Sequence, residues 1–228
     1  MCSRYSLVSS PEDVRAFFGA PAVDDFPPRY NIAPTQPVLI ARNDLKGIPE
    51  LHLVRWGLIP SWMRDPAALR APLINARSET AAERPAFRGA LRHRRCLIPA
   101  TGFYEWSGKR AARQPNLIRL KEQNLFALAG LWEDWLGADG SEIETGTILT
   151  TAANADMAAL HDRMPVIIAP EDFERWLDCR SGTAEHILDL MQPFAAGRLT
   201  ITPVNPALND VRAEGPDLQT PAASGLLL

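Results

Sequence analysis

Short apolar runs with the length of β-strands follow one another along most of this sequence, with few helical patterns between them. The runs are Val38 to Arg42, Leu51 to Trp56, Cys96 to Ile98, Gly102 to Trp106, Leu117 to Leu120, Leu125 to Trp132, Thr147 to Thr151 and Ile201 to Val204. Parallel neighbours need a long crossover connection, usually a helix, whereas antiparallel strands can be joined directly. The order of the runs therefore predicts an α+β fold with a mostly antiparallel, barrel-like β-sheet and peripheral helices.

Helical patterns occupy only a few places in the chain. Ser10 is a typical N-cap and Pro11 suits the first helical position, so we expect a helix from there to about Gly19. Further helices are expected near Ser78, near Pro85, from Glu171 to Leu177 and from Thr183 to Met191.

The size of the chain favours a single domain. Its 228 residues are 46% hydrophobic and 22% charged, which is ordinary for a globular protein and argues against extended disorder. We expect one domain over residues 1–214 and a flexible, proline-containing tail over residues 215–228.

Neither a targeting segment nor a metal motif is evident. The run from Met1 to Ser6 lacks the apolar core of a signal peptide, and no stretch reaches the roughly 18 apolar residues of a membrane span. We therefore expect no membrane association and a cytosolic protein. Cys2, Cys96 and Cys179 form no C-x-x-C pair, so we expect free thiols, no bound metal and no cofactor.

The net charge of -3 argues against a protein that coats nucleic acid by bulk electrostatics. Of the 24 basic residues, however, only Lys46, Lys109 and Lys121 are lysines. Arginine suits bidentate phosphate contacts, although a GC-rich genome also favours it. The positions of the arginines are therefore more informative than their number.

Cys2 can become chemically special when the initiator methionine is removed. Its free α-amine and its thiol then form a 1,2-aminothiol, and the amine can condense with an aldehyde while the thiol adds to the same carbon. The product is a thiazolidine ring, which no internal cysteine can form. Alternatively, Cys2 is only a small residue at an unconstrained terminus.

Glu105 is a candidate for proton transfer because it lies among aromatic residues on a predicted strand. Phe103 and Glu105 share one face of that strand, and Tyr104 lies on the other. Glu105 can equally be a surface glutamate on a polar face.

Asn75 and Arg77 follow the apolar run Pro72 to Ile74 and precede a helix, where backbone amides favour anions. The alternative is an asparagine turn and an arginine that pairs with Glu79 or Glu83.

His161 and Arg163 combine a proton carrier at neutral pH with a cation that suits phosphate. A lone histidine is more often a polar residue at a helix end. Among the tryptophans, Trp62 and Trp106 lie beside predicted turns, so we expect them to be exposed and able to stack on unpaired bases.

Seven short segments together resemble the SOS response-associated peptidase (SRAP) family, in order and over nearly the whole chain. They are Met1 to Tyr5, Tyr30 to Thr35, Arg55 to Pro60, Asn75 to Thr80, Arg95 to Pro99, Gly102 to Trp106 and His161 to Pro165. The resemblance implies a SRAP fold, binding of single-stranded DNA, and a covalent crosslink between Cys2 and the opened sugar of an abasic site. Such a protein senses and shields the lesion.

The resemblance also implies roles for individual residues. Cys2 resembles the nucleophile, Asn75 the group that positions its amine, and Glu105 and His161 the proton-transfer pair. Four further residues match positions where the family contacts DNA: Arg4, Arg77, Arg163 and, by packing on a base, Trp106. The family name implies autopeptidase action, and imine chemistry implies a lyase-like action at the lesion. Ser3 departs from the glycine usual in the family and adds bulk beside Cys2.

Two other functions remain open from the sequence. The chain can be an N-terminal nucleophile amidohydrolase, in which Cys2 attacks an amide and Asn75 contributes to an oxyanion site. It can also be a non-covalent single-strand binding module that uses arginines and tryptophans. We expect a monomer that joins the nucleoid when it is bound to DNA.

Overall fold

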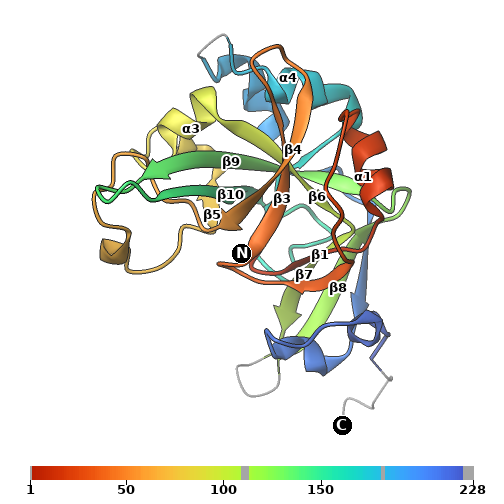
Figure 1. Ribbon diagram of the computed structural model, residues 1–228. Coiled ribbons are helices and arrows are strands. Elements are labelled where there is room, and N and C mark those ends of the chain that lie inside the picture. The colour runs from red at the N-terminus through yellow and green to blue at the C-terminus, as the bar shows by residue number, and fades with distance from the viewer. Residues whose placement is uncertain (1, 109–112, 181–182, 223–228) are drawn as a thin grey trace.

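The computed structural model describes residues 2–108, 113–180 and 183–222, and within them two β-sheets pack together (Figure 1). The larger sheet contains a ring of five strands in the order β10-β4-β3-β6-β9. The ring closes because β10 pairs with β4 on one edge and with β9 on the other. Its strands are β3 (Pro37–Asn43), β4 (Pro49–Trp56), β6 (Arg95–Ala100), β9 (Phe126–Leu136) and β10 (Glu142–Ala152). A closed barrel leaves few exposed strand edges.

Three short strands extend this barrel. They are β5 (Asn75–Arg77), β11 (Arg163–Pro165) and β12 (Ile167–Ile168). The end of β10 pairs with both β5 and β11, while β12 pairs with β9. The last residues of β10 therefore lie between the two segments that carry Asn75 and Arg163.

The second sheet has the strand order β13-β8-β7-β1-β2. Its strands are β1 (Tyr5–Leu7), β2 (Arg29–Ile32), β7 (Gly102–Ser107), β8 (Gln114–Leu120) and β13 (Leu199–Pro203). All of its pairings are antiparallel. In the larger sheet, only the pairings of β10 with β4 and with β5 are parallel among the described residues. The expected α+β, mostly antiparallel, barrel-like fold is confirmed.

All eight runs expected to be strands are strands in the structure. The sequence pattern did not predict β1, β2, β5, β11 or β12. Each of these has only two to four residues, which is too short for an alternating pattern to stand out.

The helices are short and peripheral. They are α1 (Pro11–Phe18), α2 (Ser78–Ala81), α3 (Arg88–His93) and α4 (Phe173–Leu177), with 3-10 helices η1 (Pro66–Ala68), η2 (Pro170–Asp172), η3 (Glu185–Met191), η4 (Pro206–Asn209) and η5 (Pro216–Gln219). As expected, Ser10 caps α1 by accepting the Asp13 N–H (3.1 Å), and Gly19 ends it with a φ of 64°. The helix expected up to Met191 is the 3-10 helix η3.

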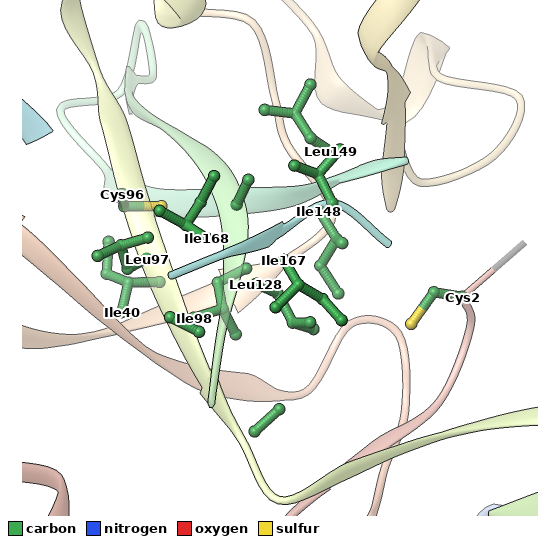
Figure 2. Close-up of a cluster of buried hydrophobic side chains, with 14 of the residues drawn as sticks. Cys2, Ile40, Cys96, Leu97, Ile98, Leu128, Ile148, Leu149, Ile167 and Ile168 are labelled. Carbon is green, nitrogen blue, oxygen red and sulfur yellow. The ribbon is translucent and has the colours of Figure 1, made fainter. Parts of the chain in front are cut away.

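The hydrophobic core fills the barrel and continues under the second sheet. Figure 2 shows side chains from several barrel strands converging there, with Cys2 at the margin of the cluster. A smaller cluster lies on the other face of the second sheet and consists of Tyr104, Leu117, Val204, Leu208 and Leu218. The C-terminal segment 205–222 supplies two of its members.

The first part of the segment expected to be a flexible tail packs on the domain. Leu218 in η5 is buried, Gln219 donates to the Tyr104 hydroxyl (2.7 Å), and Pro221 pairs with Val204. Residues 215–222 are therefore packed on the domain and do not form a loose tail. Residues 223–228 lie outside the described part of the chain.

Candidate functional site

Cys2 lies beside the end of β7, at the margin of the main core. Tyr104 N–H donates to the Arg4 carbonyl (3.0 Å) and Tyr5 pairs with Phe103, so the chain before Arg4 runs toward the Glu105 end of β7. The Cys2 side chain is completely buried, and its thiol approaches the Arg4 carbonyl at 3.9 Å. Burial raises the pKa of the Cys2 thiol far above its usual range, and the Glu105 carboxylate raises it further.

Asn75 is hydrogen-bonded to the backbone of Cys2. Its Nδ2 donates to the Cys2 carbonyl at 2.9 Å. Its Oδ1 is buried and has no hydrogen-bond partner among the described residues. The position of Asn75 is fixed by the pairing of β5 with β10 and by Trp56, whose indole N–H donates to the Ile74 carbonyl (2.9 Å). A buried amide oxygen without a partner is unusual.

Glu105 is buried in the structure, which contradicts its alternative reading as a surface glutamate. It shares a face of β7 with Phe103, which belongs to the main core, while Tyr104 belongs to the smaller cluster. Its charge contributes to the raised pKa of the Cys2 thiol, so the two groups lie within electrostatic reach. The structure therefore brings Cys2, Asn75 and Glu105 together.

Arg77 and Arg163 lie on either side of β10 but have different surroundings. Arg163 forms a bidentate ion pair with Glu79, at 2.6 and 2.8 Å, and also donates to the Thr150 carbonyl (2.6 Å). This pair holds the pKa of Glu79 below its usual range. Among the described residues, Arg77 forms no ion pair with Glu79 or Glu83, although its charge also lowers the pKa of Glu79. Arg77 is exposed at the end of β5.

His161 lies at the turn before β11, where two groups approach its Nδ1. Arg163 N–H donates to this nitrogen at 2.9 Å, and an Asp162 carboxylate oxygen lies 2.8 Å from it. A neutral imidazole with an unprotonated Nδ1 accepts from Arg163, whereas a protonated ring pairs with Asp162. Both groups therefore approach the same ring nitrogen of His161.

Arg4 and Trp106 form a second cluster. The guanidinium of Arg4 lies 5.6 Å from the centre of the Trp106 ring, and Trp106 donates to Asn209 Oδ1 (2.7 Å). Trp106 is only partly exposed, whereas Trp62 is 62% exposed, as expected. Asn31, which accepts a hydrogen bond from Arg4 at 2.6 Å, was not predicted as a site residue from the sequence. Its place in the Tyr30 to Thr35 segment was the only signal for it.

Within the described residues, no group of three or more His, Cys, Asp or Glu side chains could hold a metal ion. None of the helices in this part of the chain has the length and apolar character of a membrane span. The site therefore combines the Cys2 thiol with the Asn75 amide and the buried Glu105 carboxylate. Arginines and the Trp106 indole are the other candidate binding groups.

The fold and this arrangement define a class of α+β proteins in which a barrel supports a cysteine at the second position. Residues 1–211 match the family described as SOS response associated peptidase (SRAP). The chain belongs to the SRAP family, so the resemblance found in the sequence is confirmed.

Three similar proteins illustrate the relationship. The abasic site processing protein YoqW of Bacillus subtilis is 38% identical over 224 residues, which cover 96% of this chain and 98% of that protein. The abasic site processing protein HMCES of Gallus gallus is 30% identical over 229 residues, covering 87% and 68%. A crystal structure of a protein from Bacteroides thetaiotaomicron has a TM-score of 0.84 at 26% identity and covers 97% and 100%.

Proposed function

We propose that this protein senses and shields abasic sites in single-stranded DNA by forming a covalent thiazolidine crosslink through Cys2. The family and the names of the relatives support abasic site processing. The observation that carries the covalent mechanism is the Asn75 amide, which donates to the Cys2 carbonyl while its Oδ1 is buried without a partner among the described residues.

The reaction begins with removal of Met1, which frees the α-amine of Cys2. Asn75 Oδ1 can then accept an N–H of that amine and orient its lone pair toward the aldehyde of the opened sugar. The amine attacks the aldehyde carbon, and loss of one water gives an imine. The thiol then adds to the imine carbon, its proton passes to the nitrogen, and the five-membered ring closes.

The environment of the thiol indicates this order of steps. Because the pKa of the Cys2 thiol is raised, sulfur is protonated and a weak nucleophile at neutral pH. The amine therefore reacts first, and the sulfur needs a base when it adds. Glu105 is within electrostatic reach of the thiol and is the candidate for that base. His161 is the candidate for proton delivery to the departing water, as the resemblance to the family implies.

Two groups of residues are the candidates that hold the DNA strand. Arg4 and Trp106 provide a cation and an indole face in one group, and Arg77 and Arg163 provide cations in the other. Phosphate contacts and base stacking together bind single strands without requiring a positive net charge. Arg163 is shared with Glu79, so a phosphate must compete with that carboxylate.

The same groups account for two associated activities. Autopeptidase action hydrolyses the peptide bond before Cys2 and so exposes the amine that the crosslink needs. Lyase-like action uses the same imine, which acidifies the neighbouring sugar carbon and allows the 3′ phosphate to leave. We expect the protein to act as a monomer in the cytosol and to join the nucleoid when DNA-bound.

A denaturing gel of the protein with an abasic single strand tests the mechanism. We expect a slowly migrating adduct that disappears completely in Cys2→Ala and in Cys2→Ser. An amidohydrolase would instead turn over small amides and give no adduct, and a non-covalent binding module would bind the strand without one. Intact-mass measurement provides the decisive control, because a chain that retains Met1 and still forms the adduct contradicts the aminothiol mechanism.

A further inference from the structure

Asn31 is fully buried in β2, yet the chemistry above gives it no role. Its Oδ1 accepts a hydrogen bond from Arg4 Nη1 at 2.6 Å. Its Nδ2 donates to the carbonyls of Asp210 (2.9 Å) and Ala213 (3.0 Å). One side-chain amide therefore links Arg4 to the backbone of the segment 205–214.

The hydrogen bonds of Arg4 leave one edge of its guanidinium group without a partner among the described residues. Nη1 donates both to Asn31 and to the Leu208 carbonyl (3.1 Å), and these are the guanidinium's hydrogen bonds within the described residues. The Nε and Nη2 edge is left for an outside acceptor, which suits the two oxygens of a phosphate. Trp106 lies 5.6 Å from the guanidinium and limits its movement on another side.

The segment 205–214 is itself well fixed, so it can serve as a support. The Glu214 carboxylate accepts the backbone N–H groups of Tyr30 (2.9 Å) and Asn31 (3.3 Å). Leu208 is completely buried in the smaller cluster, and Asn209 holds the Trp106 indole. Arg4 and Trp106 are therefore both held by one segment that lies more than 100 residues away in the sequence.

The choice of asparagine has an electrostatic reason. A carboxylate at this position would also accept from Arg4, but it would neutralise the guanidinium and face two backbone carbonyls. An apolar residue would leave both the guanidinium and the carbonyls without partners. Asparagine provides one acceptor and two donors without charge, so Arg4 is oriented without a carboxylate at this position.

We propose that Asn31 is a positioning residue, which fixes one edge of Arg4 to the segment 205–214 so that the other edge binds a DNA phosphate. This inference rests on the proposed function, because it assigns a phosphate of the single strand to Arg4. It adds a residue and a supporting segment to the binding site.

The experiment measures binding to a single strand carrying a tetrahydrofuran abasic analogue, which lacks the aldehyde and cannot be crosslinked. We expect Asn31→Asp to weaken binding roughly tenfold, because a charge-assisted hydrogen bond to phosphate is lost. The slope of log affinity against log salt should fall by about 0.7, the value for one phosphate contact with a single strand. Asn31→Ser, which adds no charge, should weaken binding but keep the wild-type slope.

A double-mutant cycle with Arg4→Ala separates positioning from general damage. If Asn31 acts through Arg4, Asn31→Asp has no further effect on the slope in the Arg4→Ala background. The matched control is Asn154→Asp, since Asn154 is also buried and donates to a carbonyl, that of Phe194 at 2.9 Å. We expect this control to keep the wild-type slope.

Two outcomes would overturn the inference: an unchanged slope in a folded Asn31→Asp protein, or an equal reduction with and without Arg4. If Asn31→Asp does not fold, Asn31→Ser in the same cycle decides, because its loss of affinity must vanish in Arg4→Ala. Crosslinking to a natural abasic strand is measured in parallel. Failure of wild type to form the Cys2 adduct contradicts the proposed function, whereas normal adduct formation with additive Asn31 and Arg4 effects contradicts only this inference.

Discussion

Two buried polar centres lie in different parts of this domain and differ in whether their polar groups have hydrogen-bond partners. Arg95 in β6 is 1% exposed beneath α3 and α4, the helices at the top of Figure 1, away from the N-terminus. Its guanidinium donates to the carbonyls of Trp176 (2.7 Å), Leu91 (2.8 Å) and Asp178. The site around Cys2 instead contains a thiol with a strongly raised pKa and an amide oxygen, Asn75 Oδ1, without a partner among the described residues.

The difference distinguishes a structural centre from a reactive one. Arg95 joins the ends of two helices to the barrel, and the carbonyls at helix C-termini need donors. Each of its contacts is complete in the folded protein. Near Cys2, the Asn75 amide is held in place but its Oδ1 has no partner among the described residues, so it can accept a further hydrogen bond. Changes at Arg95 should therefore affect stability, and changes near Cys2 should affect reactivity.

The largest effect on stability is expected for Arg95→Met. Methionine fills much of the space but leaves four carbonyls, those of Leu91, Arg92, Trp176 and Asp178, without their donor. This loss should lower the free energy of unfolding by about 3 kcal/mol. Denaturant unfolding measures this loss. Arg88→Met is the matched control, because Arg88 is an exposed arginine on α3 and should change stability by less than about 0.5 kcal/mol. Similar losses in the two variants would contradict the structural role of Arg95.

Asn75→Leu should do the opposite of Arg95→Met and reduce the crosslinking rate with little loss of stability. It removes the amide proposed to orient the Cys2 amine, so crosslinking should slow by roughly 10- to 100-fold, as expected when a reacting group loses its orientation. The free energy of unfolding should change by less than about 1 kcal/mol, because one hydrogen bond and one unsatisfied oxygen are lost together. Single-turnover crosslinking and denaturant unfolding of the same variant test this contrast. Parallel losses of rate and stability would show that Asn75 is mainly structural.

The sequence predicted the barrel strands well because each has five or more residues with a clear apolar pattern. It did not predict β5 or β11, the short strands that carry Asn75 and Arg163, since pairing with β10 rather than local pattern creates them. The contact between Asn75 and Cys2 joins residues 73 positions apart. The Asn31 link depends on a segment near the other end of the chain, and composition gave no sign of it.

Glu105→Gln tests how the Glu105 charge affects the Cys2 thiol. The pKa of Cys2 is raised by burial and by the Glu105 charge, so the thiol stays protonated near neutral pH and gains thiolate only as pH rises. Removing the charge should lower that pKa and increase alkylation of Cys2 by a small neutral reagent, while crosslinking slows because the base is lost. Peptide mass spectrometry over a pH series follows Cys2, with the half-buried Cys179 as internal reference. Faster crosslinking in Glu105→Gln would contradict the assigned role of Glu105 as base.

Arg77→Ala should give the smallest effect, because Arg77 is exposed and an exposed cation contributes through screened electrostatics. Binding of intact and abasic single strands should weaken by a similar factor, and the slope of log affinity against log salt should fall by about 0.7, the value for one phosphate contact. Stability and the crosslinking rate of the saturated complex should not change, since Arg77 lies outside the group formed by Cys2, Asn75 and Glu105. Affinity measured at several salt concentrations tests the expected slope, and the single-turnover rate at saturating DNA tests the expected rate. A slower rate at saturation would mean that Arg77 orients the sugar rather than only anchoring the strand, and the reactive centre would then extend across β5.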